Sequence, residues 1–186
     1  MSKILGVDGG LANLGLSVVT LTPTTMSVEC MTLITTEKAS KKVVSLASED
    51  NVKRTQEVAR ALENIMSAWK IQAICAESMS YPRNSSAAAK MSLCWGALAT
   101  LAEIKGIPIV QASPQQVKLS VCGRKDASKE DIQEALKLKF KPQKIEDLVS
   151  GLAKSKWEHP FDSLGAVVAC LDSQLIKMLR NIEQEK

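Results

Sequence analysis

The first 34 residues contain three apolar runs separated by short polar stretches, a pattern that predicts three β-strands. The run KILGVD at residues 3–8 ends in an acid, and GLSVVTL at residues 15–21 and SVECMTLI at residues 27–34 follow it. The last two runs are joined by TPTT, a cluster typical of a turn. Strands joined so closely are expected to form an antiparallel meander.

Further along, apolar positions recur at helical spacing or gather in short buried runs. We expect residues 35–50 to form a polar loop and a helix to begin near Asn51, because apolar residues then recur every three or four positions. The run IQAICAE at residues 71–77 predicts a short buried strand, which again ends in an acid. The alanine- and leucine-rich stretch from Ala87 to Lys105 predicts a long helix that ends at Gly106.

The second half of the chain continues this alternation of strand and helix. The run IPIVQA at residues 107–112 predicts a strand. Ser113 is a typical cap residue and Pro114 a typical first helical residue, so a helix should follow at once. Ser128 with Asp131 three positions later resembles the capping box of another helix.

A last long helix is expected to begin near Pro160 and to run towards Gln184. The order of elements predicts an α/β fold whose sheet is antiparallel on one side and parallel through the middle. A length of 186 residues suits one well-formed core, so we expect a single domain over residues 1–186.

Composition narrows the class of protein. Apolar residues make up 45% and charged residues 24%, as in an ordinary soluble globular protein. No apolar run approaches the ~18–20 residues of a membrane span, and the N-terminus lacks the layout of a secretory signal. The five cysteines never form a CxxC pair. We therefore expect free thiols in a protein that is not secreted, located in the cytoplasm or wherever its substrate is.

Positive charge is concentrated in one part of the sequence. Between Pro82 and Lys144 there are 11 Lys and Arg residues against 5 Asp and Glu residues, although the whole chain has a net charge of only +4. This asymmetry is typical of a protein with a polyanionic partner. A solvated, lysine-rich surface would produce the same pattern.

Two acids stand where predicted parallel strands end. Asp8 follows KILGV and Glu77 follows IQAICA, and such strand ends meet at one edge of a sheet. Converging carboxylates suit hard divalent cations such as Mg²⁺. Asp162 would add a ligand, and His159, the only histidine, would lie beside it because positions three apart on a helix are neighbours. Taken singly, each of these residues could instead be a turn, surface or helix-cap residue.

Four sequence blocks, taken together, resemble the RuvC-type Holliday junction resolvases. They are ILGVDGGLANLGLSVV, ICAES, SPQQVKLSVCGRKDASKEDIQ and HPFDSLGAVVAC, in the family's order, between residue 4 and about residue 172. The resemblance implies an RNase H-like fold with helices on both faces of the sheet. It also implies a homodimer that nicks two opposing strands of a four-way DNA junction, with Mg²⁺ or Mn²⁺ and no nucleotide cofactor.

The resemblance also implies roles for individual residues. Asp8, Glu77 and Asp162 fall on the catalytic acids that hold two metal ions. His159 falls on a fourth position that is an acid in some members and a histidine in others. Gly9 departs from the family, because it stands where a proline is usual, and the polar loop at residues 35–51 and the segment LVSGLAKSKW are further departures.

The basic residues and one aromatic residue are candidates for contacts with DNA. Tyr81 follows Glu77 closely and could stack on an unpaired base, or could simply pack on Pro82 at the surface. The cationic candidates are Arg83, Lys118, Arg124, Lys125 and Lys129. Lysines at helix starts and turns are natural phosphate ligands, and Lys118 could also stabilise charge on the reacting phosphate. A solvated basic turn is the alternative.

The helix from Ala87 to Leu101 is apolar around most of its surface, which fits either a dimer interface or core packing. We expect a metal-dependent DNA endonuclease that leaves 5′-phosphate ends. Three alternatives remain open at this point: a related nuclease that processes ribosomal RNA precursors, an actin-like ATP-binding protein, and a catalytically inactive DNA-binding protein.

Overall fold

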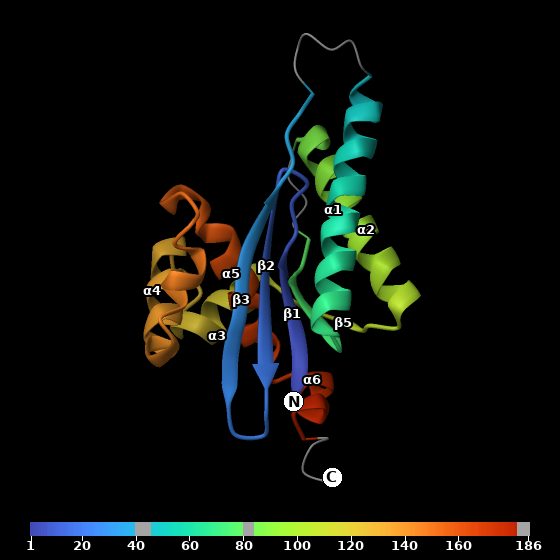
Figure 1. Ribbon diagram of the computed structural model, residues 1–186. Helices are drawn as coiled ribbons and strands as arrows, with labels where there is room; N and C mark the ends of the chain where they lie inside the picture. Colours follow the sequence, from blue (N-terminus) through green and yellow to red (C-terminus); the bar gives the residue numbers. More distant parts are fainter. Residues whose placement is uncertain (40–45, 80–83, 182–186) are drawn as a thin grey trace.

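A computed structural model describes residues 1–39, 46–79 and 84–181 of the chain. A five-stranded mixed sheet in the order β3-β2-β1-β4-β5 forms its centre (Figure 1). The strands β1 (Ser2–Asp8), β2 (Asn13–Leu21) and β3 (Met26–Thr35) are an antiparallel meander, whereas β4 (Ala73–Glu77) and β5 (Ile109–Ala112) continue the sheet in parallel with β1. The predicted mixed sheet is confirmed.

Helices cover both faces of the sheet, as the resemblance implied (Figure 1). The helices α1 (Ala47–Trp69) and α2 (Ser85–Lys105) pack on one face. The helices α3 (Pro114–Cys122), α4 (Lys129–Lys139) and α5 (Glu158–Cys170) pack on the other. Because strand side chains alternate between faces, each face has its own apolar core. Leu5 and Leu62 belong to the α1–α2 core, and Ile4 and Phe161 belong to the α5 core.

The predicted helix caps at Ser113 and Ser128 are correct, but the predicted start of the first helix and the predicted extent of the last helix are not. Ser113 and Ser128 each accept a hydrogen bond from the backbone of the third helical residue. The first helix begins at Ala47, inside the expected loop, because the Glu49 side chain accepts a hydrogen bond from the N–H of Leu46 and stabilises an earlier turn.

The expected last helix is in fact two helices. The chain turns between α5 and α6 (Gln174–Asn181), where the Ser173 hydroxyl accepts a hydrogen bond from the N–H of Ile176 and caps the new helix. Three short 3₁₀ helices, η1 (Lys141–Gln143), η2 (Ile145–Val149) and η3 (Lys154–Lys156), lead from α4 to α5. Among the described residues no helix is both long and apolar enough to cross a membrane.

Candidate active site

Two of the candidate acids lie side by side at one edge of the sheet. β1 and β4 are parallel neighbours whose last paired residues are Val7 and Ala76. Asp8 and Glu77 each follow that pair by one residue and complete their strands. The parallel topology therefore brings together two carboxylates that are 69 positions apart in the sequence.

The first turns of α5 bring the third acid to the same edge. This helix crosses the sheet so closely that a Cβ atom on Gly15 would collide with the backbone oxygen of His159. A residue with any side chain at position 15 would push the helix away from the sheet. Asp162 is held there with only 15% of its side chain exposed. Glycine at position 15 therefore permits the close approach of α5 to β2.

His159 contacts the acid site directly. Its Nδ1 atom lies 2.8 Å from Oδ2 of Asp8, a hydrogen bond across 151 positions of sequence. The Nε2 atom lies 3.6 Å from Oε1 of Glu158. The helix begins at Glu158, so Pro160 is its third residue rather than its first, and no side chain caps its start. The helix-cap alternative for His159 therefore does not describe this structure.

Two lysines bring positive charge to the acids. Nζ of Lys129 lies 2.6 Å from Oε2 of Glu158 and 3.6 Å from Oδ2 of Asp162. Burial works against the charge on Lys129, but the hydrogen bond to Glu158 and the charge of Asp162 raise the pKa of the lysine overall. Lys118, on α3, acts at longer range, and its charge opposes the rise in the pKa of Glu77.

The acids repel one another strongly. Burial, followed by the charges of Asp162 and Asp8, raises the pKa of Glu77 to about 7. Burial and the charge of Asp8 likewise raise the pKa of Asp162 to about 6. Carboxylates held together despite this cost are a frequent feature of functional sites.

The donor set fits a hard divalent cation. As the side chains stand, no three His, Cys, Asp or Glu residues among those described are arranged tightly enough to hold an ion. Asp8 is drawn to His159 and Asp162 to Lys129 instead. Three carboxylates with mutual repulsion are nevertheless the oxygen ligands that Mg²⁺ prefers, and a cation between them would offset the repulsion.

The remaining candidates lie in different surroundings. Arg124 is paired with Asp131 at 2.5 Å and Asp126 at 3.3 Å, so its charge is largely neutralised in the turn between α3 and α4. Lys125 lies in the same turn, next to Arg124. Tyr81 and Arg83 lie outside the described residues.

Glu158 was missed by the sequence reasoning, although it stands four residues before Asp162 and therefore on the same face of α5. Its contacts to Lys129 and His159 make it a member of the same charged cluster. The i,i+4 spacing was the signal that could have identified it. Its partner Lys129 begins α4, and the sequence spacing does not reveal that contact.

Comparisons with known proteins place this geometry in a family. The family described as "Crossover junction endodeoxyribonuclease RuvC" matches residues 4–153, so the match ends before α5. A protein of that name from Natranaerobius thermophilus is 28% identical over 155 residues, covering 82% of this chain and 91% of the relative. The one from Synechococcus is 27% identical over 154 residues, covering 81% and 94%.

Solved structures of low sequence identity share the fold. The Thermus thermophilus RuvC in complex with a Holliday junction substrate has a TM-score of 0.69 at 22% identity and covers 91% of this chain and 92% of that one. The yeast mitochondrial Holliday junction resolvase has a TM-score of 0.67 at 16% identity, with coverages of 99% and 84%.

Proposed function

This chain belongs to the RuvC family of crossover junction endodeoxyribonucleases, and on that premise we propose how its own residues resolve a four-way DNA junction. The observation that carries the proposal is the meeting of Asp8, Glu77 and Asp162 at one edge of the sheet, with the pKa values of Glu77 and Asp162 raised to about 7 and about 6. The whole chain would act as one nuclease domain.

The three acids would hold divalent cations, two in number, with Mg²⁺ as the usual ion and Mn²⁺ as a substitute. Such ions lower the pKa of a bound water and offset the charge of the attacking and leaving oxygens in phosphodiester hydrolysis. Asp8 and Glu77 would face the ions from the strands and Asp162 from α5. Both sides of the site are then fixed by regular secondary structure rather than by loops.

His159 would act as a further ligand or as the base that orients water. When Nδ1–H donates to Oδ2 of Asp8, Nε2 carries the free lone pair and can accept a proton or bind a metal. Lys118 would face the scissile phosphate and stabilise its developing charge. Lys129, Arg124 and Lys125 would contact phosphates of the junction arms, and hydrolysis would leave 5′-phosphate ends.

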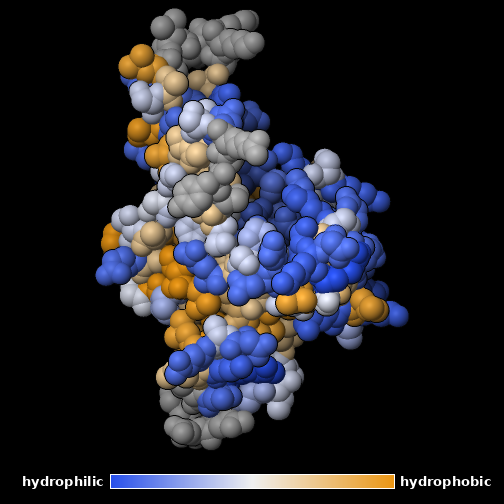
Figure 2. All heavy atoms as spheres, turned by 180° about the vertical axis from the view of Figure 1, so that it is seen from behind, coloured by the Kyte–Doolittle hydropathy of each residue, from blue (hydrophilic) through white to orange (hydrophobic). Residues whose placement is uncertain are grey.

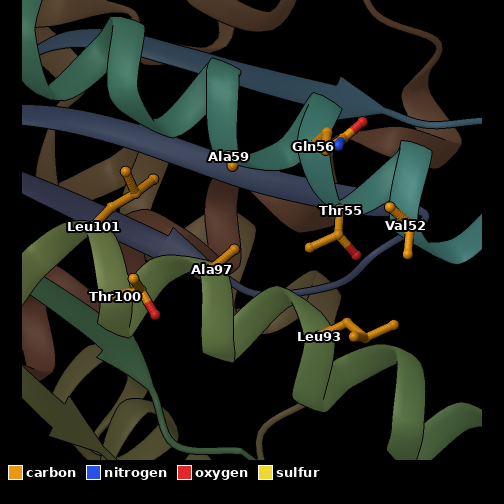
Figure 3. Close-up of a pocket in the computed structure, with 8 residues that line it drawn as sticks. All are labelled: Val52, Thr55, Gln56, Ala59, Leu93, Ala97, Thr100 and Leu101. Atoms are coloured by element: carbon orange, nitrogen blue, oxygen red, sulfur yellow. The ribbon is translucent and has the colours of Figure 1, made fainter.

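We also infer that the protein works as a homodimer, because two coordinated nicks need two active sites. An apolar groove of about 350 Å³ lies between α1 and α2, lined by Val52, Thr55, Gln56, Ala59, Leu93, Ala97, Thr100 and Leu101 (Figure 3). Val52 is 54% exposed and Leu93 is 36% exposed. Hydrophilic side chains crowd the α3–α4 side, and hydrophobic surface gathers towards the α1–α2 side (Figure 2). The second copy would cover the groove.

Replacement of Leu93 by Asp would place a charge in this groove without touching the acids. We expect the wild-type protein to be a dimer by light scattering at micromolar concentration and Leu93→Asp to be a monomer that no longer makes paired nicks. The exposed Leu138→Asp on α4 is the matched control. A wild-type monomer that cuts both strands would contradict the dimer.

The decisive experiment is incubation of the protein with a synthetic four-way junction, with and without Mg²⁺. Paired nicks that need the ion would support the nuclease proposal. Binding without cutting in any divalent cation would support the inactive DNA-binding alternative, and cleavage of structured RNA in preference to the junction would support ribosomal RNA processing.

The five cysteines form no disulfide, which suits action in a reducing compartment that holds DNA.

A further inference from the structure

A small pocket opens beside the acids on the side of α2. Its volume is about 70 Å³, and Asp8 and Glu77 form one wall. The other walls come from Gly9, Ser78, Met79, Met91 and Trp95. A single water molecule needs about 10–15 Å³ of such space, so the pocket can hold a group several times the size of a water molecule. A sugar ring and a pyrimidine ring are of similar size, so the chemistry of the walls must distinguish them.

Trp95 has a free hydrogen-bond donor at this pocket. Its indole N–H makes no hydrogen bond to any described residue. The Trp157 N–H, by contrast, donates to the backbone oxygen of Leu152 at 3.1 Å. Trp95 is half-buried and lines the pocket, so its N–H is available to a ligand that enters there.

Gly9 keeps the pocket open. A Cβ atom at this position would lie 3.4 Å from Nε1 of Trp95 and 3.7 Å from its Cδ1. Such a Cβ atom would be in ordinary van der Waals contact with the indole, so Gly9 leaves the donor of Trp95 open to the pocket.

The chemistry of the walls restricts the ligand. Two carboxylates on one wall disfavour a second phosphate, whereas the N–H of Trp95 needs an oxygen acceptor. The thioethers of Met79 and Met91 suit C–H surface. A neutral group with ether or hydroxyl oxygens and an apolar face fits all three conditions, and the sugar of DNA is such a group.

We infer that this pocket binds the deoxyribose of the nucleotide next to the scissile phosphate, with the Trp95 N–H donating to a sugar oxygen. The inference rests on the proposed function, since it needs a phosphate at Asp8 and Glu77. Trp95 is then a binding residue that positions the strand for cutting, and Gly9 makes room for the sugar.

The first test uses Trp95 as a reporter. In the Trp69→Phe/Trp157→Phe variant, Trp95 is the only tryptophan. Titration with a synthetic four-way junction in EDTA, which prevents cutting, should change its emission and saturate with the binding measured by gel shift. The difference between wild-type and Trp95→Phe spectra gives the same information if the double variant folds poorly. An abasic nucleotide beside the cleavage site should preserve the change, because the sugar is still present.

The second test separates binding from turnover. Trp95→Phe keeps the ring but removes the donor, so kcat for junction cleavage should fall roughly 3-fold to 10-fold, as for the loss of one hydrogen bond, with junction affinity unchanged. Gly9→Ala should lower kcat in the same direction by narrowing the pocket. Trp69→Phe is the matched control and should keep wild-type kcat.

Three results would overturn the inference and leave the nuclease proposal standing: junction binding with unchanged Trp95 emission, loss of the emission change at the abasic site, or an unchanged kcat in Trp95→Phe. The second of these would assign the pocket to a base instead of a sugar. Failure of the wild-type protein to bind any junction would overturn the proposed function and this inference together.

Discussion

Two glutamates of the same sheet have opposite electrostatic surroundings. Glu29 on β3 accepts hydrogen bonds from Thr20 and Ser27, and with help from Lys3 these lower its pKa. Glu77 on β4 is buried near two other acids, and its pKa is raised to about 7.

The two surroundings distinguish an acid that stabilises the fold from an acid that belongs to the candidate site. An acid surrounded by hydrogen-bond donors stabilises the fold in its charged form. An acid buried among other acids lowers the stability of the fold, and such acids are frequent at functional sites. The Glu29 end of the sheet is complete by itself. In the proposed function, a cation would balance the Glu77 end.

The largest effects are expected when the three acids of the candidate site are replaced singly. Asp8→Asn, Glu77→Gln and Asp162→Asn should each lower junction cleavage at least ~100-fold, because each removes a charged ligand from the proposed metal site. Junction binding should be retained or tighter, because repulsion of phosphate falls. Gel-based cleavage and binding assays measure the two effects separately.

Glu29→Gln is the control for this series, and it should cut junctions like the wild-type protein. Full activity in any one of the three acid variants would remove that residue from the proposed metal site. Loss of activity in Glu29→Gln would show that the two ends of the sheet are not independent.

His159 tests whether the acid end needs a nitrogen ligand or base. His159→Ala should lose most cleavage activity, and His159→Asp should recover part of it with Mg²⁺, which prefers oxygen ligands. The wild-type protein should tolerate Mn²⁺ comparatively well because imidazole suits transition metals. Near-normal Mg²⁺-dependent cleavage by His159→Ala would leave the ring with a structural hydrogen bond to Asp8 only.

Substitution of one lysine near each glutamate tests whether the two ends of the sheet differ in their effect on turnover. Lys118→Ala should lower turnover about 10-fold with little change in affinity if its charge acts on the reacting phosphate, while Lys3→Ala, at the Glu29 end, should leave turnover unchanged. Rates and affinities on the same junction distinguish the two. Equal turnover of the two variants would show that the charge of Lys118 does not act on the reacting phosphate.

The turn between α3 and α4 offers a weaker effect of a different kind. The Arg124→Ala/Lys125→Ala variant should bind junctions less tightly, and the slope of log affinity against log salt should shrink by roughly one unit per lost phosphate contact. Because Arg124 is already paired with Asp131, most of the change should come from Lys125. An unchanged slope would place this turn away from DNA.

The smallest effect concerns stability and pH without metal. The folded chain keeps a proton on Glu77 up to a pH of about 7, whereas the unfolded chain releases it near 4.5. The free energy of unfolding should therefore fall between those pH values, by about 1–2 kcal/mol after allowance for partial exposure. Glu77→Gln should remove the part of this fall that comes from Glu77, while Asp162, whose pKa is raised to about 6, should still lower the free energy of unfolding up to that pH.

Glu29 contributes with the opposite sign, since its lowered pKa stabilises the fold above pH 4.5 and that contribution is lost at lower pH. Denaturant unfolding in EDTA across pH 4–8 measures both glutamates. Mg²⁺ at pH 8 should restore the free energy of unfolding that is lost through ionisation of Glu77, and should therefore raise Tm. A free energy of unfolding that rises between pH 4.5 and 7 in the wild type but not in Glu77→Gln would contradict the reversed behaviour of Glu77.

Local patterns in the sequence determined the elements and the position of the acids along them. Apolar runs set the strands, Ser113 and Ser128 set two helix starts, and Gly106 ends α2. These signals act within a few residues, so no knowledge of the fold is needed to find them. Asp8 and Glu77 were recognised at strand ends for the same reason. Asp162 and His159 were proposed as their partners from their spacing at the expected helix start, and the family resemblance implied the same set.

Only the tertiary structure decided what these residues face. The contact of His159 with Asp8, the link from Lys129 to Glu158 and the pocket beside Trp95 join segments far apart in the chain. Such contacts depend on the strand order and on how closely α5 crosses β2 at Gly15. The raised pKa of Glu77 likewise comes from burial and from charges on other elements, which only the folded chain brings within range.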